Sequence, residues 1–217
     1  MMNTFASALT PAFAAEYASL TDEYPNAPPG KLAALALYEA SEVTDDPTVA
    51  TYFHRHSVDI KTALNLAEPI CLHRVRFGWR NIFSFAIDGE PALVLTVHDV
   101  DAETEVDLVA WSASNPSKFG TFLGTSGLLG ADQIINTASF FGNRPLAVHR
   151  TPLGWLQAGC NGIVILSASK ARVTLVRRLG PLLAEDIRHA EAIVRQCAPA
   201  LSSDDVFIAG DTGRAAA

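Results

Sequence analysis

The spacing of apolar residues changes once along the chain, close to residue 73. Before that point apolar residues recur at intervals that suit one face of a helix. Four of them lie four positions apart, at Phe5, Leu9, Phe13 and Tyr17. Similar patterns predict further helices over 31–43 and 47–66, with Pro69 ending the last. Residues 1–68 are therefore expected to form a helical N-terminal segment.

From His73 onward, apolar and polar residues alternate as they do in a half-buried strand. In "HRVRFGWRN" the apolar side chains are expected on one face and the basic ones on the other. The apolar set is Val75, Phe77 and Trp79, and the basic set is Arg74, Arg76 and Arg80. Three more strands are expected over 82–87, 92–100 and 105–111. Short strands in succession predict an antiparallel meander.

The stretch "PLAVHRTPLGWLQAGCNGIVIL" predicts a change to parallel pairing. After the strand "LAVHR", Thr151 is a good N-cap and Pro152 suits the first helical position. Gly159 ends the short helix and "IVIL" resumes as a strand, so we expect one βαβ crossover. An edge strand over 171–176, a helix over 181–198 and a last edge strand at "VFIA" complete the pattern.

Together these elements predict an α+β fold. A helical N-terminal segment, residues 1–68, is expected to pack on a mixed, mainly antiparallel sheet with one parallel βαβ crossover unit, residues 69–217, as a single folding unit. The glycine-rich stretch "GTFLGTSGLLG", residues 120–130, has neither the P-loop nor the dinucleotide-binding pattern. It is expected to be a connector before a helix over 131–141, or else a mobile loop over a pocket.

Charge and cysteine content narrow the functional classes. The net charge of −7 disfavours broad nucleic-acid binding, because that binding depends on many Lys and Arg side chains. The three cysteines lack the paired spacing of zinc or redox motifs. No stretch approaches the ~20 apolar residues that span a bilayer, and the first basic residue is Lys31. We expect a cytoplasmic protein with no membrane partner and no cofactor, a divalent cation excepted.

That exception concerns the acidic alternation "VHDVDAETEVDLVAW". With a three-residue turn, Asp99 would oppose Glu105, and with Asp107 they would gather on one face of a hairpin. These three carboxylates with His98 would suit a metal-dependent phosphoesterase or nuclease. The run lacks the spacing of a calcium-binding loop, and the alternative is the solvated tip of a hairpin.

The arginine face has two interpretations as well. Arg74, Arg76 or Arg80 would pair with Asp107 or Glu105 across the sheet, or they would contact phosphate or nucleic acid. The alternation places Trp79 on the opposite face, which weakens a combined aromatic and basic surface.

Catalytic candidates depend on the fold to bring them together. His98, Asp107, His149 and Cys160 are far apart in sequence, and no spacing favours a cysteine–histidine nucleophile. For Cys160 the structural alternative is a small apolar residue at a tight turn.

The pair of segments "VDLVAW" and "PLAVHRTPLGWLQAGCNGIVIL" resembles a family of uncharacterised bacterial proteins, some of them carried on prophages and other mobile elements. The resemblance covers the last half of the chain. That family has no assigned activity or catalytic residues, so the resemblance implies only a context, the DNA metabolism of a mobile element.

The sequence therefore favours a non-catalytic binding or accessory protein. The alternatives are the metal-dependent phosphoesterase or nuclease and a structural subunit of an assembly. In the last case a protein partner or a second copy of the chain would bind through the apolar N-terminal helices.

Overall fold

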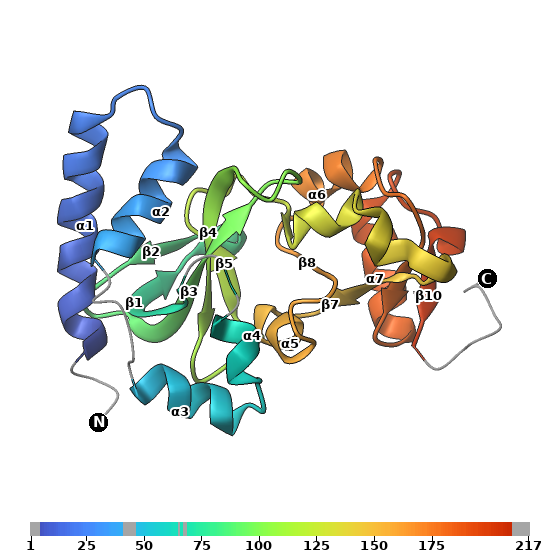
Figure 1. Cartoon of the computed structure of the whole chain (residues 1–217), viewed down its shortest axis with the longest axis horizontal. Coiled ribbons are helices and arrows are strands. Elements are labelled where there is room, and N and C mark those ends of the chain that lie inside the picture. The colour runs from blue at the N-terminus through green and yellow to red at the C-terminus, as the bar shows by residue number, and fades with distance from the viewer. Residues whose placement is uncertain (1–4, 41–46, 65, 67–68, 210–217) are drawn as a thin grey trace. The chain divides into compact units, whose positions relative to one another are not determined.

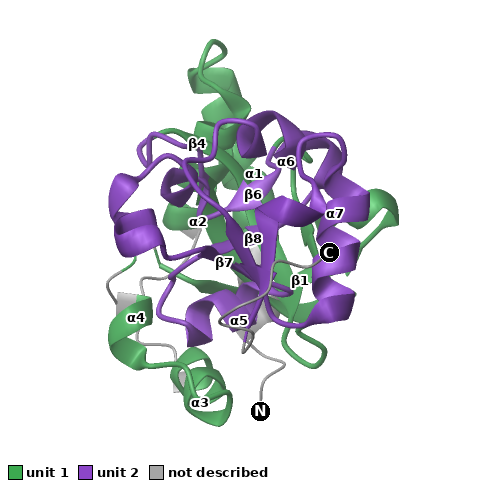
Figure 2. Ribbon diagram, turned by 90° about the vertical axis from the view of Figure 1, so that its right-hand side faces the viewer, with its two compact units in different colours: residues 1–97, 104–125 green, residues 98–103, 126–217 purple. Residues whose placement is uncertain are grey.

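The computed structural model describes residues 5–40, 47–64, 66 and 69–209. They fall into two compact units, shown in green and purple in Figure 2. Unit 1 comprises residues 1–97 and 104–125, and unit 2 comprises residues 98–103 and 126–217. The predicted α+β class is confirmed, but the strands form two sheets, one with unit 1 and one with unit 2. The boundaries of these units differ from the predicted boundary between residues 68 and 69.

The first sheet holds five strands in the order β2-β1-β3-β4-β5. They are β1 (Cys71–Phe77), β2 (Phe83–Phe85), β3 (Glu90–His98), β4 (Glu105–Ser112) and β5 (Phe119–Thr121). Strand β1 pairs antiparallel with both β2 and β3, so the expected sequential meander is wrong at its start. Residues 86–89 carry the chain from one side of β1 to the other.

Two N-terminal helices, α1 (Phe5–Glu23) and α2 (Pro29–Ala40), pack on this sheet (Figure 1). Phe13, Leu32 and Leu37 are buried in one cluster with apolar strand residues such as Val75. Burying one such leucine contributes about 1.5–3 kcal/mol. A Cβ on Gly30 would meet the Glu105 carbonyl oxygen at 2.4 Å, so glycine permits the close approach of α2 to β4.

The helix expected over 47–66 is two helices, α3 (Pro47–Arg55) and α4 (Ile60–Leu64). The break is at Ser57, whose φ of 54° is left-handed. The backbone N–H of Lys61 then donates to the Asp59 side chain at 3.0 Å, which satisfies one of the free N–H groups of the second helix. In the described residues no helix is both long enough and apolar enough to cross a bilayer.

The second sheet has the order β10-β9-β7-β8-β6. Its strands are β6 (Leu128–Leu129), β7 (Leu146–His149), β8 (Ile163–Ile165), β9 (Leu182–Ala184) and β10 (Val206–Ile208). Strands β10, β9, β7 and β8 are parallel, and only β6 is antiparallel to its neighbour. The predicted crossover through α5 (Pro152–Gln157) is confirmed, with Thr151 accepting the Gly154 N–H at 3.0 Å.

Two further crossovers between parallel strands follow, from β8 to β9 and from β9 to β10, and the sequence predicted neither of them. The expected edge strand over 171–176 is wrong, because those residues lie in α6 (Ala168–Leu175) and one residue beyond it. Ala171 and Leu175, four apart, are buried on one face of that helix, while Val173 and Val176 are exposed. The expected helix over 181–198 begins only at α7 (Ile187–Cys197), because Leu182–Ala184 form β9.

The glycine-rich stretch carries short strands rather than a connector alone. Strands β5 and β6 both fall in or at the edge of it, and Gly127 lies where a Cβ would meet the Ala171 backbone nitrogen at 2.3 Å. The helix expected over 131–141 is wrong: two 3-10 segments, η2 (Ala131–Ile134) and η3 (Thr137–Asn143), take its place. Shorter 3-10 turns are η1 (Trp79–Asn81) and η4 (Ser203–Asp205).

Candidate functional site

Asp107, a predicted metal ligand, is fully buried on β4 and bonded to the protein. Its carboxylate accepts the backbone N–H groups of Leu108, Leu123 and Thr125 at 2.7–2.8 Å, and the Thr125 hydroxyl at 3.0 Å. These bonds hold residues 123–125 against β4. A cation would have to displace them, so the structure gives Asp107 a supporting role.

The other predicted carboxylates have separate surroundings. Asp99 is exposed and accepts the N–H of Val100 at 2.8 Å, and the Asp99 carbonyl accepts the N–H of Ala102, as in a solvated turn. Glu105 begins β4 and is half-buried, and His98 ends β3. Within the described ranges, no three His, Cys, Asp or Glu side chains are placed to hold a metal ion. The phosphoesterase hypothesis therefore has no geometric support there.

The catalytic candidates His149 and Cys160 are not assembled as a cysteine–histidine nucleophile. His149 Nε2 lies 2.7 Å from the Asn161 carbonyl oxygen, so this nitrogen donates. Burial raises the pKa of the Cys160 thiol to about 11, which keeps it protonated at neutral pH. In the described part of the chain, the two side chains share no hydrogen bond.

The carboxyl ends of the parallel strands in unit 2 carry charged groups that sequence reasoning did not group together. Strand β7 has β8 on one side and β9 on the other, and ligands of open α/β sheets bind at such a reversal. Arg150, just after β7, donates to Glu185 and Asp186, just after β9, both at 2.7 Å. The Arg150 guanidinium lowers the pKa of Asp186. The point at which the strand order changes direction is therefore occupied by ion pairs between side chains of the protein itself.

The three arginines predicted to share one face of a strand each have a different partner. Arg74 donates to the Gly89 carbonyl at 2.6 Å, and Arg76 makes a two-pronged ion pair with Asp88 at 2.6 and 2.7 Å. Arg80 instead lies over an aromatic ring: its guanidinium carbon is 4.2 Å from the ring centroid of Trp79. The prediction that Trp79 and the arginines lie on opposite faces is therefore wrong for Arg80.

Arg80 and Trp79 lie together because strand β1 ends at Phe77, before either residue, so the alternation of a strand no longer applies to them. Arg80 has φ 60°, ψ 29° and Asn81 has φ 58°, two successive left-handed residues that are not glycine. Such residues are uncommon and cluster at functional sites. The reversal turns the Arg80 side chain back over the Trp79 ring, which is 80% exposed.

The turn is held firmly by its neighbours. The Gly78 N–H donates to the Ile82 carbonyl at 2.7 Å, and Ile82 bridges to Thr121 of β5. A Cβ on Gly120 would meet the Asn81 carbonyl oxygen at 2.5 Å, so only glycine lets β5 pass so close. The Trp79–Arg80 turn is therefore a fixed feature of unit 1.

A pocket of about 400 Å³ adjoins this turn. Its lining includes Phe77, Asn81, Asn115, Ser117, Lys118 and Phe119. The Lys118 ammonium lies 5.0 Å from the Phe77 ring centroid and forms an ion pair with Glu90. The surface thus combines aromatic rings, cations, amides and a hydroxyl. We treat it as the candidate site.

No family model matches this chain, and no curated protein or solved structure is significantly similar to it. The resemblance of the C-terminal half to proteins of mobile elements stays a prediction. Function is argued below from the geometry of each unit alone.

Proposed function

We propose that this chain is a non-catalytic nucleic-acid-binding accessory protein whose Trp79–Arg80 turn binds single-stranded nucleic acid. The observation that carries the proposal is the 80% exposed indole with a guanidinium 4.2 Å from its centroid. Arg80 covers one face of the ring. The opposite face then offers a base a stacking surface, which is worth about 1–3 kcal/mol per base.

The neighbouring groups suit the rest of a nucleotide. Arg80 attracts backbone phosphates, and Lys118 would do so by exchanging its ion pair with Glu90 for a phosphate. The amides of Asn81 and Asn115 offer donors and acceptors for base edges. The pocket of about 400 Å³ lies within the usual range for small-ligand sites. Single strands expose the bases that such a surface needs, whereas a duplex hides them.

The charge of the whole chain limits the strength of this contact. With a net charge of −7 and few cations at the turn, only one or two phosphates would be neutralised. The logarithm of the binding constant should then fall with log salt at a slope of about −0.7 to −1.4. Modest affinity of this kind fits an accessory role.

The experiment is a fluorescence-anisotropy titration of a labelled single-stranded oligonucleotide with the full chain. Trp79→Ala and Arg80→Ala are each expected to weaken binding at least tenfold. Tyr38→Ala and Arg55→Ala are the matched controls, since both side chains are exposed in unit 1 outside the turn. Equal affinity of Trp79→Ala and Tyr38→Ala would overturn the proposal.

A further inference from the structure

Unit 2 carries a second pocket, independent of the Trp79–Arg80 turn. It has a volume of about 510 Å³ and lies at the amino ends of β7 and β8. The lining residues that matter are Asp132, Asn136, Ser139, Arg144, Ala147 and Gly162. All of them belong to unit 2.

Hydrogen bonds and a close backbone contact fix one wall of the pocket. The Gln133 side chain donates to the Cys160 carbonyl and accepts the Gly162 N–H, both at 2.7 Å. Gly162 has φ 101°, and a Cβ there would meet the Ala147 carbonyl oxygen at 2.4 Å. The pocket is therefore preformed on this side, which favours ligand binding by reducing the loss of conformational entropy.

Arg144 brings an uncompensated positive charge to the pocket. Three arginines of unit 2 are tied to oxygens: Arg150 to two carboxylates, Arg172 to the Gln196 carbonyl and Arg178 to Asp205. The remaining described ones besides Arg144 are exposed and lie outside the pocket lining: Arg177, Arg188 and Arg195. Among the described residues, Arg144 has no such partner. A guanidinium beside a pocket is the group best suited to a phosphate.

Two further donors line the same pocket. Asn136 accepts the Ala138 N–H at 3.0 Å through its side-chain oxygen, which leaves its NH₂ group as a donor. Ser139 supplies a hydroxyl. Asp132 adds an acceptor of the kind that binds sugar hydroxyls, and its carboxyl pKa is raised by burial.

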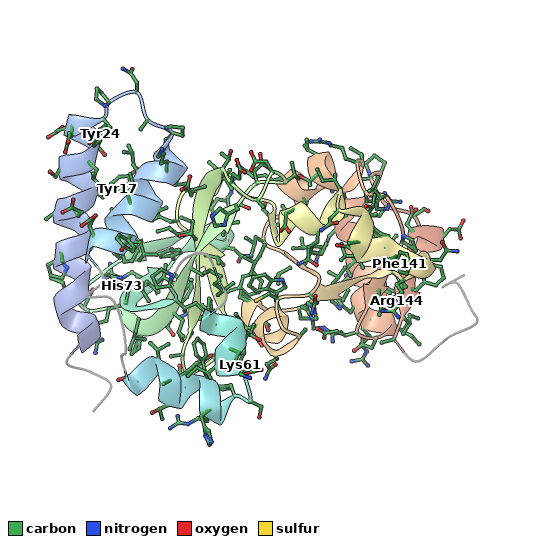
Figure 3. The ribbon with its side chains drawn as sticks, viewed as in Figure 1. Tyr17, Tyr24, Lys61, His73, Phe141 and Arg144 are labelled. Atoms are coloured by element: carbon green, nitrogen blue, oxygen red, sulfur yellow. The ribbon has the colours of Figure 1, made fainter. Side chains whose placement is uncertain are left out.

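An exposed aromatic ring lies close in sequence to this polar set, outside the lining of the pocket. Phe141 is 81% exposed and is three residues from Arg144; both are labelled in unit 2 in Figure 3. Phe141 (φ −58°, ψ 132°) and Gly142 (φ 69°, ψ 30°) have the angles of the central residues of a type II turn, which displays the ring at its tip. An exposed phenyl ring suits stacking on a planar base.

We propose that this pocket binds a nucleoside 5′-phosphate, with the phosphate on Arg144, Ser139 and Asn136, the sugar hydroxyls on Asp132, and the base against Phe141. The same chemistry is offered by a free nucleotide and by the 5′-phosphorylated end of a strand. The site does not depend on the proposed function of unit 1.

The experiment is calorimetric titration of the full chain with AMP, ribose 5-phosphate, inorganic phosphate and a 5′-phosphorylated trinucleotide. AMP is expected to bind at least fivefold more tightly than ribose 5-phosphate. Arg144→Ala should lose at least tenfold in AMP affinity, whereas Arg177→Ala, an exposed arginine of unit 2 outside the pocket, should change it less than twofold. Phe141→Ala should abolish the preference for AMP over ribose 5-phosphate. Thermal melting checks that each variant is folded.

The contradicting results are equally specific. AMP binding no tighter than inorganic phosphate binding, or the same loss in Arg177→Ala as in Arg144→Ala, would overturn the proposal. Tighter binding of the trinucleotide than of AMP would assign the site to strand ends, and the reverse would assign it to free nucleotides. Trp79→Ala should leave AMP affinity unchanged, which separates this test from that of the proposed function.

Discussion

The Asp107 carboxylate accepts two hydrogen bonds from Thr125, one from its backbone N–H at 2.7 Å and one from its hydroxyl at 3.0 Å. With the bond from the Leu123 N–H, this buried anion fixes the end of unit 1 to β4. Together with the Leu108 N–H, these donors explain how a charge is tolerated at 0% exposure.

Removing this carboxylate should destabilise unit 1 strongly. Asp107→Ala leaves the N–H groups of Leu123 and Thr125 unpaired, each at about 1–3 kcal/mol, so a loss of about 2–6 kcal/mol is expected in urea unfolding. Asp88→Asn, which breaks an exposed ion pair with Arg76, is the control and should lose less than about 1 kcal/mol. Equal losses would contradict the supporting role of Asp107.

His73 should make the protein less stable in mild acid. Its ring, labelled in Figure 3, is fully buried near Phe13 and Phe85, and among the described residues neither ring nitrogen has a hydrogen-bond partner. Burial lowers the pKa of His73 from 6.5 to about 4. The unfolded chain therefore takes up this proton first, and stability falls as the pH drops from 6.5 towards 4.

The matching variant is His73→Leu, which removes the unpaired polar ring. Urea unfolding at pH 7.5 and pH 5 should show that this variant loses less stability between the two values than the parent, by about 1–2 kcal/mol. Its free energy of unfolding at pH 7.5 should also be higher. Parallel pH dependences would assign the acid sensitivity to other groups.

Cys160 should react slowly with thiol reagents. With its pKa at about 11, the thiolate fraction at pH 7.5 is very small. Cys71 and Cys197 are buried. Reaction with a disulfide reagent should therefore be slow in the native protein and complete within seconds to minutes in urea. Fast reaction of one thiol at pH 7.5 would restore the cysteine nucleophile as a hypothesis.

The support for the Trp79–Arg80 turn can be tested from the strand beneath it. Gly120→Ala would place a Cβ 2.5 Å from the Asn81 carbonyl oxygen, so the turn or β5 must move. We expect a loss of about 1–3 kcal/mol in stability and weaker oligonucleotide binding. Gly154→Ala is the control, because its nearest contact would be an ordinary 3.4 Å. Unchanged binding by Gly120→Ala would show that the turn does not depend on this contact.

Elements with strong local signals could be predicted from the sequence. The α5 crossover follows from Thr151, Pro152 and Gly159, which act within a few residues. In contrast, "ARVTLV" alternates like a strand, yet forms α6 because Ala171 and Leu175 are buried together in the core of unit 2. Tertiary packing therefore determines that this segment is a helix, and the local sequence pattern does not show which side chains will be buried together.

The candidate site was predicted in part. The basic residue Arg80 and the aromatic Trp79 were both visible, but their stacking depends on two left-handed residues after Phe77 that alternation alone does not reveal. The Arg150 network and the Arg144 pocket depend on which strands become neighbours, as in the order β9-β7-β8. The sequence offers the residue types but not their proximity.

Trp79 itself provides the most direct measurement of the central claim. Of the three tryptophans, Trp111 is 0% and Trp155 is 6% exposed, whereas Trp79 is 80% exposed, so collisional quenching with acrylamide acts mainly on Trp79. A saturating single-stranded oligonucleotide is expected to reduce this quenching to the level of the Trp79→Phe variant. Quenching that is unchanged while the oligonucleotide is bound would contradict the assignment of the Trp79–Arg80 turn as the nucleic-acid site.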